Sequence, residues 1–113
     1  MFQNNVLIKE INNNCNPIKG EVYWAITSAT DPKLTRPVLI IKAMNEKAGD
    51  FLVVSLTSDV PAHVNNNMIV KIGEERSRIQ PSFHQVIHKS MLLNKCAEVP
   101  ENVVQRIKKS LNN

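Results

Sequence analysis

Short apolar segments separated by polar turns fill the sequence between residues 20 and 88. In the first, Val22, Trp24 and Ile26 recur with the two-residue period of a strand. The second, residues 38–41, is continuous and rich in branched side chains, which favours a strand buried on both faces over a helix. The pattern predicts about five strands, over residues 21–27, 38–41, 51–56, 68–72 and 82–87, with a polar break at 73–81 before the last.

The C-terminal segment changes to a helical period. From residue 100 to residue 111 the apolar side chains fall on one helical face. Pro100 suits the first helical position, and Glu101 suits the positive end of the helix dipole. The sequence therefore predicts a mostly β fold, a small antiparallel sheet or barrel with one helix packed against it. Residues 1–18 form a polar, asparagine-rich arm without assigned chemistry, and residues 19–113 form a single domain. The apolar face of the helix is expected in the core and consists of Val103, Val104, Ile107 and Leu111. A short apolar run before it is expected in the core or at a dimer contact and consists of Met91, Leu92 and Leu93.

Composition excludes several classes of protein. The chain has 113 residues, and none of its apolar runs approaches the roughly 20 residues of a membrane span. No secretory signal is visible at the N-terminus, so we expect a cytoplasmic protein whose Cys15 and Cys96 are reduced thiols. The three histidines form no zinc-binding spacing with either cysteine, so we expect neither a metal nor a cofactor.

The charge balance permits an anionic partner. Fourteen Lys and Arg against ten Asp and Glu give a net charge of +4, which suits phosphate or an acidic protein segment without requiring either. Five aromatic residues are too few for a broad platform for single strands, but they leave one or two stacking contacts. Trp24 is expected in the core with Val22 and Ile26. Tyr23 is expected to face the opposite side and is the better stacking candidate.

Two strand ends carry polar groups that suit a phosphate. Arg36 opens the second strand, and Thr57 and Ser58 close the third. If these strands are antiparallel neighbours, the guanidinium lies beside the two hydroxyls, below a loop that carries Asp31 and Lys33. Fixed charge beside hydroxyl donors can bind a phosphate without a metal. On spacing alone, a solvated arginine and ordinary turn residues remain the favoured interpretation.

Four segments, in this order and spacing, resemble the MazF/PemK family of toxin endoribonucleases. They read KGEVYW at 19–24, TRPVLII at 35–41, LVVSLTS at 52–58 and SFHQV at 82–86. The resemblance covers about residues 18 to 112. The chain departs from the family pattern in three places: Glu21 and His84 each replace an aspartate, and the loop before Arg36 lacks the frequent glycine-rich, glutamate-containing stretch.

The resemblance implies a fold, a reaction and partners. The fold is an SH3-like barrel with a helix, forming a homodimer that binds single-stranded RNA along its interface and is inhibited by an acidic antitoxin. The reaction is metal-independent cleavage, in which the RNA 2′-hydroxyl attacks its own phosphate. Arg36 stabilises the developing charge, and Thr57 orients the phosphate with support from Ser58. Asp31 or His84 takes the proton, and histidine is better matched for this. The other substrate-binding residues are Lys33, Gln85 and Tyr23.

Two other functions fit the same residues. The related gyrase-poisoning toxins resemble this family in fold but act through protein contact, and the altered acidic positions favour that class. Retention of Arg36 and Thr57 weighs against it. The third possibility is a degenerate relative that binds RNA or a partner without cutting.

Overall fold

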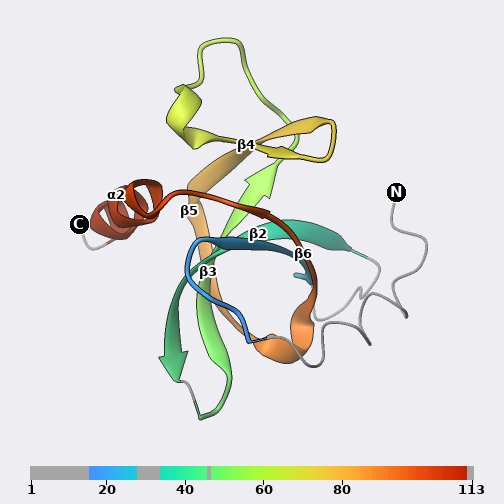
Figure 1. The fold of residues 1–113 in the computed structure, drawn as a ribbon, viewed down its shortest axis with the longest axis vertical. Coiled ribbons are helices and arrows are strands. Elements are labelled where there is room, and N and C mark those ends of the chain that lie inside the picture. Colours follow the sequence, from blue (N-terminus) through green and yellow to red (C-terminus); the bar gives the residue numbers. More distant parts are fainter. Residues whose placement is uncertain (1–15, 28–33, 46, 112–113) are drawn as a thin grey trace.

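A computed structural model describes residues 16–27, 34–45 and 47–111 (Figure 1). Most of the arm expected at residues 1–18 lies outside these ranges. No helix within them is long and apolar enough to cross a membrane. The elements, in chain order, are β1 (Glu21–Ile26), β2 (Thr35–Asn45), β3 (Asp50–Thr57), the 3-10 turn η1 (Asn66–Met68), β4 (Ile69–Ile72), β5 (Glu75–His88), the 3-10 turn η2 (Lys89–Met91), β6 (Leu92–Glu98) and α2 (Glu101–Leu111).

The strands form one antiparallel sheet in the order β4-β5-β3-β2-β1-β6. The sheet curls until its two edge strands, β4 and β6, approach each other, so the barrel is nearly closed. The helix α2 lies to one side of it, against β5 (Figure 1). The predicted fold class, a small antiparallel barrel with one C-terminal helix, is confirmed.

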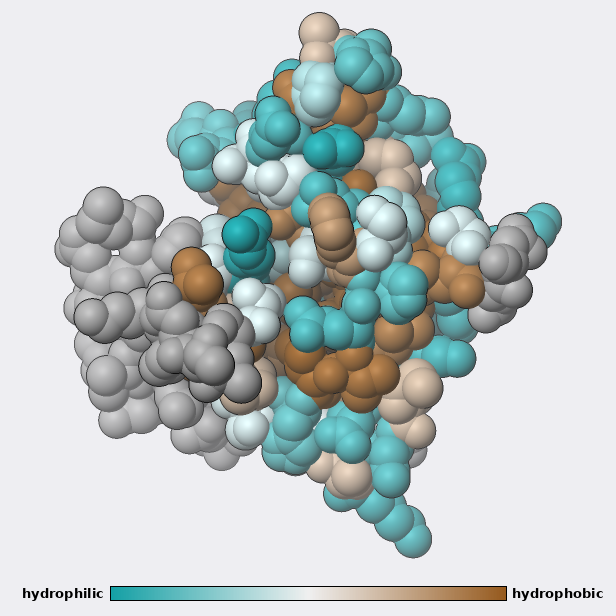
Figure 2. Space-filling model, turned by 180° about the vertical axis from the view of Figure 1, so that it is seen from behind, coloured by the Kyte–Doolittle hydropathy of each residue, from teal (hydrophilic) through white to brown (hydrophobic). Residues whose placement is uncertain are grey.

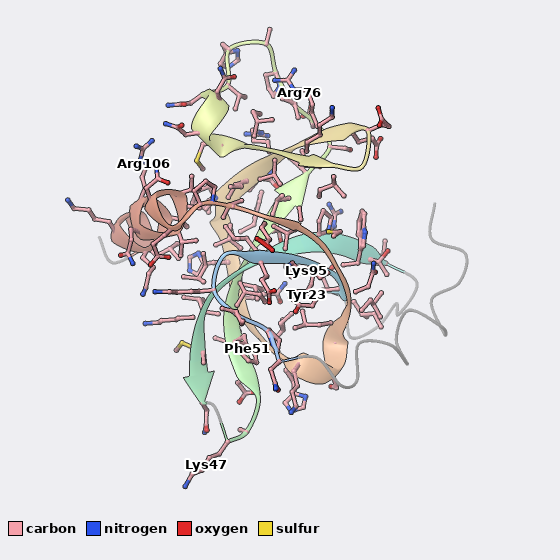
Figure 3. All side chains as sticks on the ribbon, in the orientation of Figure 1. Tyr23, Lys47, Phe51, Arg76, Lys95 and Arg106 are labelled. Atoms are coloured by element: carbon pink, nitrogen blue, oxygen red, sulfur yellow. The ribbon has the colours of Figure 1, made fainter. Side chains whose placement is uncertain are left out.

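Side chains on the two faces of the sheet build two apolar clusters, because neighbours along a strand point to opposite sides. Tyr23 and Phe51, in the second cluster, point into the barrel (Figure 3). Seen from behind, hydrophilic residues surround a hydrophobic area below the middle of the molecule (Figure 2). The first cluster contains Val22, Leu39, Ile41, Val54, Leu56, Val70, Ile79, Val103 and Ile107. The second contains Tyr23, Ala25, Val38, Ile40, Phe51, Val53, Ile87 and Leu92.

The structure has six strands where the sequence predicts about five. The additional strand is β6, whose Leu92 and Leu93 are buried in the core rather than exposed for a dimer contact. The polar Asn94 and Lys95 follow them directly and obscure the period.

The predicted polar break at residues 73–81 is wrong. Only a tight turn at Gly73, with a φ of 62°, separates β4 from β5, and β5 begins at Glu75. In this stretch Ser77 and Ile79 are buried while Arg76 is exposed. The charged residues on the solvent side mask the strand period in the sequence.

The helix α2 forms as predicted. Val103, Val104 and Ile107 are buried, and Leu111 packs against the first cluster. Pro100 stands just before the first turn rather than within it, and its carbonyl accepts the N–H of Val103 at 3.0 Å.

Gly20 fixes the start of β1 against two other parts of the barrel. Its N–H donates to the Ile40 carbonyl at 2.9 Å, and its carbonyl accepts the N–H of Val99 at 2.8 Å. Its φ is +92°, and an added Cβ would lie 3.2 Å from the Val99 carbonyl oxygen. A side chain here would meet both backbone strain and a close contact, so glycine suits this junction.

Glu21 ties β1 to β6 through a charged network. Its carboxylate accepts from the Ile18 N–H at 2.8 Å and from the Tyr23 hydroxyl at 3.0 Å, and it pairs with the Lys95 ammonium at 3.1 Å. Burial acts to raise the pKa of Glu21, but these partners outweigh burial and hold the pKa below its usual value of 4.5.

Replacing Glu21 with glutamine is expected to lower the free energy of unfolding by about 1 kcal/mol at neutral pH. The effect is modest because solvent screens part of the attraction between Glu21 and the half-exposed Lys95. Because folding lowers the Glu21 pKa, the carboxylate contributes its full stabilisation above the usual pKa. That contribution disappears as the pH falls through the pKa of the folded protein. Urea unfolding of Glu21→Gln at neutral and acid pH measures this. Glu98→Gln, which removes the more exposed partner of Lys95, serves as the control and should have a smaller effect. A Glu21→Gln deficit that persists unchanged into acid would contradict the account.

Candidate functional site

The register of β2 against β3 brings Arg36 next to Thr57. Val38 pairs with Ser55, and continuing the same antiparallel register by two residues sets Arg36 opposite Thr57. Both side chains line one hollow of about 500 Å³, here called the first hollow. Its other lining residues are Thr27, Ser55, Gln80, Phe83, His84 and Gln85.

The first hollow is the polar continuation of the second apolar cluster. Residues two apart on a strand share a face, so each strand passes along this face from the core to the hollow. Thus Val38 is buried while Arg36 is exposed, and Val53 is buried while Ser55 and Thr57 line the hollow. The same change occurs from Ala25 on β1 to Thr27 just after it, and from Ile87 to Gln85 on β5. Four strands from the rigid core therefore hold the polar groups in place.

Hydrogen bonds prepare Thr57 to act as a donor. Its Oγ1 accepts the N–H of Asp59 at 3.2 Å, which leaves the hydroxyl proton for another acceptor. The Asp59 carbonyl in turn accepts from Arg78 Nε at 3.2 Å, so the turn after β3 is anchored to β5. Arg36 is exposed and forms no ion pair with any residue in the described ranges. Among the described residues, no ion pair thus competes with an anion for this guanidinium, and the hydroxyl proton is free to be donated.

An irregularity in β5 adds further groups to the first hollow. Between the pairs Val54–His84 and Leu56–Ile79, the single residue Ser55 faces four residues of β5, numbers 80–83. Pro81 lies within this bulge and has no N–H for the ladder. The Pro81 carbonyl oxygen lies 3.1 Å from His84 Nδ1. The bulge directs Gln80, Phe83 and His84 toward Arg36 and Thr57.

Ser58 lies on a different side of the pair. A second hollow, of about 300 Å³, is lined by Arg36, Thr57 and Ser58, together with Trp24 and Glu75 among others. Ser58 follows directly after the end of β3, and it lines the second hollow but not the first. Arg36 and Thr57 therefore form a ridge shared by two hollows.

Four residues singled out in the sequence have other outcomes. Tyr23 is 2% exposed, in the second apolar cluster, and its hydroxyl donates to Glu21. Tyr23 faces the opposite side of β1 from Val22, as expected, but that side is covered as well, so the ring is not open to a stacking base. Trp24, expected in the core, is half-buried at the second hollow. Asp31 and Lys33 lie outside the described residues.

Sequence reasoning missed several residues of the site. Phe83 and Gln80 enter it through the bulge, and no local pattern reveals a bulge beyond Pro81 itself. Arg78 pairs with Thr57 across the β3–β5 ladder, so their side chains share a face. The two-residue spacing of Arg76, Arg78 and Gln80 could have indicated a strand with one polar face, but a segment this polar is typical of a turn.

Other reactive groups lie away from this site. Burial raises the pKa of the Cys96 thiol to about 11, so the thiol stays protonated and unreactive at neutral pH. Among the described residues, no group of three or more His, Cys, Asp or Glu side chains is placed to hold a metal ion.

Comparison with protein families decides the relationship. Residues 18–113 match the model of the PemK-like, MazF-like toxin of type II toxin-antitoxin systems. The chain belongs to this family. The resemblance that the four sequence segments indicate is thereby confirmed. No curated protein matches the chain significantly.

Solved structures of PemK/MazF-like proteins share the fold. A mycobacterial endoribonuclease in complex with its cognate antitoxin is 19% identical, with a TM-score of 0.59 over 85% of this chain and 91% of the other. A second mycobacterial endoribonuclease is 20% identical, with a TM-score of 0.55 over 84% and 86%. A MazE–MazF structure from Deinococcus radiodurans is 17% identical, with a TM-score of 0.62 over 85% and 92%. At these identities the likeness establishes the fold alone.

Proposed function

We propose that this PemK/MazF-like protein is the toxin of a toxin-antitoxin pair and cleaves single-stranded mRNA as a metal-independent endoribonuclease. The observation that carries the proposal is the ridge formed by Arg36 and Thr57 between two hollows. Membership of the toxin family and the endoribonuclease activity of similar structures support it. A strand that crosses the ridge places one phosphate on the pair and one nucleotide on either side.

The ridge offers the interactions that the reaction needs. The RNA 2′-oxygen forms a bond to the adjacent phosphorus, and the bond from phosphorus to the 5′-oxygen breaks. Negative charge gathers on the non-bridging oxygens, where the Arg36 guanidinium stabilises it. The Thr57 hydroxyl, whose oxygen already accepts from the Asp59 N–H, donates a hydrogen bond to the same phosphate and keeps its proton. The products are a 2′,3′-cyclic phosphate and a 5′-hydroxyl, whose oxygen takes a proton from water.

His84 is the proposed base for the 2′-hydroxyl proton. A carbonyl oxygen only accepts hydrogen bonds, so the contact from Pro81 places a proton on His84 Nδ1. In the neutral ring, Nε2 is then the nitrogen that accepts a proton. His84 is exposed and lines the same hollow as Arg36 and Thr57, within the reach of a bound strand.

Replacing His84 with alanine is expected to reduce kcat by about 100-fold, the range of general-base catalysis. Chemical rescue distinguishes this role from a structural one. Added imidazole should restore part of the rate lost in His84→Ala, because it supplies the missing base, whereas a fold defect would not respond to it. His88→Ala is the control, because His88 caps η2 away from the hollow. A wild-type rate in His84→Ala would assign the base elsewhere.

A basic stripe continues from the ridge across the sheet. Arg78 lies opposite Thr57, Arg76 is two residues along the same strand, and Lys71 is opposite Arg76. These side chains share one face, and Arg76 lies on the hairpin at the upper end of the molecule (Figure 3). Like charges directly opposite each other destabilise a ladder, so the Lys71–Arg76 pair suits a polyanionic partner. We propose that RNA and an acidic antitoxin segment compete for this face, and that the toxin acts as a homodimer.

The proposed activity is tested by incubating the purified protein with single-stranded RNA in the presence of a chelator. The account expects cleavage of RNA and none of the all-deoxy strand of the same sequence, which lacks the attacking hydroxyl. Intact RNA together with growth arrest through a topoisomerase would instead support the protein-binding class of toxin. RNA that is bound but intact would indicate a degenerate relative.

A further inference from the structure

Phe83 is an aromatic side chain left open to solvent inside a polar hollow. It is 59% exposed, although it lies on a strand of a well-packed barrel. The other aromatic rings in the described ranges are less available, because Tyr23 and Phe51 are 2% and 8% exposed and Trp24 is half-buried at the second hollow. Exposing a phenylalanine forfeits its burial energy, so its position calls for a partner.

The bulge in β5 positions this ring. Ser55 faces four residues of β5 where a regular ladder would set one, and Phe83 is the last of the four. The bulge residues on either side of Phe83 are linked, because His84 Nδ1 lies 3.1 Å from the Pro81 carbonyl oxygen. Regular pairing resumes at His84, opposite Val54. The ring therefore stands on a defined backbone anchored by a buried strand rather than on a free loop.

The surroundings of Phe83 suit a nucleobase better than an apolar protein surface. All other residues that line the first hollow are polar, and they include the amides of Gln80 and Gln85 and the Arg36 guanidinium. The nearest exposed apolar residue on the strand, Val86, pairs with Leu52 and points to the opposite face. A base presents a flat apolar face and polar edges, and a single ring beside amides and a cation matches both.

We propose that the first hollow is a nucleobase subsite in which one base of the RNA stacks on Phe83, next to the phosphate held by Arg36 and Thr57. The amides of Gln80 and Gln85 are placed to meet the polar edge of that base and give the enzyme its base preference. The inference rests on the proposed RNA substrate but not on cleavage, since stacking contributes to binding before any bond breaks.

Binding of an uncleavable all-deoxy strand tests the subsite separately from catalysis. Fluorescence anisotropy should show that Phe83→Ala weakens binding about 10-fold or more, the range for losing one stacked base, while Phe83→Trp retains affinity. Val86→Ala is the matched control, since Val86 is 51% exposed on the same strand but on the opposite face. In a Trp24→Phe background, the indole introduced by Phe83→Trp is the only one in the chain, and its fluorescence should change on binding.

An abasic scan locates the stacked base. Bases are removed from the strand one position at a time. At one position, removing the base should weaken wild-type binding about as much as Phe83→Ala does. Combining that abasic strand with Phe83→Ala should then cause little further loss of affinity. The subsite would be overturned if Phe83→Ala and Val86→Ala weakened strand binding equally. It would also be overturned if, at every position, removing the base weakened binding to Phe83→Ala as much as binding to the wild type. Normal strand binding by Phe83→Ala with loss of antitoxin or dimer contact would also overturn it. If the wild type binds the strand through Phe83 yet leaves RNA intact, the cleavage proposal fails and the subsite stands.

Discussion

Replacing Arg36 with alanine is expected to slow the cleavage of single-stranded RNA by at least about 100-fold, at a wild-type level of folding. The size of this rate loss follows from the role of Arg36 as a preorganised donor to the negative charge that develops in the transition state. Removing one such donor lowers kcat by about 10²–10³. Arg36 is exposed and makes no ion pair within the described part of the chain, so its loss leaves no buried group unsatisfied. Single-turnover cleavage with saturating enzyme isolates this effect from binding.

Three further variants define the role of Arg36. Arg36→Lys keeps the charge but loses the planar fork and should recover only part of the rate. Thr57→Val preserves the shape of the side chain and removes the hydroxyl, and it should also lower kcat. Arg106→Ala, on the exposed side of α2, is the charge control and should cleave like the wild type. If Arg36→Ala cleaved RNA at the wild-type rate, the ridge would have no role in the reaction.

Replacing Ile107 with alanine is expected to lower the free energy of unfolding by about 2–5 kcal/mol. Ile107 is 1% exposed and belongs to the same buried cluster as Leu39 and Ile79, which joins α2 to the sheet. Truncation removes apolar contacts and leaves a cavity that a β-barrel cannot easily close. For a domain of this size such a loss is a large fraction of the total stability.

Equilibrium unfolding in urea measures this effect. Gln105→Ala, two positions away on the exposed side of α2, should change the unfolding free energy by no more than about 0.5 kcal/mol. A loss below about 1 kcal/mol in Ile107→Ala would mean that α2 is not docked on the barrel as described.

The fold was predictable from the sequence to the extent that periodicity marks burial. Residues 38–41 and the face formed by Val103, Val104 and Ile107 reveal a buried strand and a docked helix, because apolar side chains recur where they meet the core. The first half of β5 and the strand β6 were hidden for the opposite reason. Their exposed sides carry charged groups such as Arg76 and Lys95, and the sequence there resembles a turn.

The site was predictable only in part, because sequence spacing gives proximity but not the irregularities of a ladder. An antiparallel β2–β3 pair was enough to place Arg36 beside Thr57. The burial of Tyr23 depended on whether its own face of β1 is covered, and both faces are. The position of Phe83 depended on a bulge whose size is set by the pairing of β5 with β3.

The central claim is that Arg36 and Thr57 hold one phosphodiester while its own 2′-oxygen displaces the 5′-oxygen. The most direct measurement is the chemical identity of the new ends on one mapped RNA fragment pair produced by the purified protein in chelator. The account predicts a 2′,3′-cyclic phosphate on one fragment and a 5′-hydroxyl on the other. A 3′-hydroxyl with a 5′-phosphate would show that water, rather than the adjacent 2′-hydroxyl, attacks phosphorus, and would contradict the account.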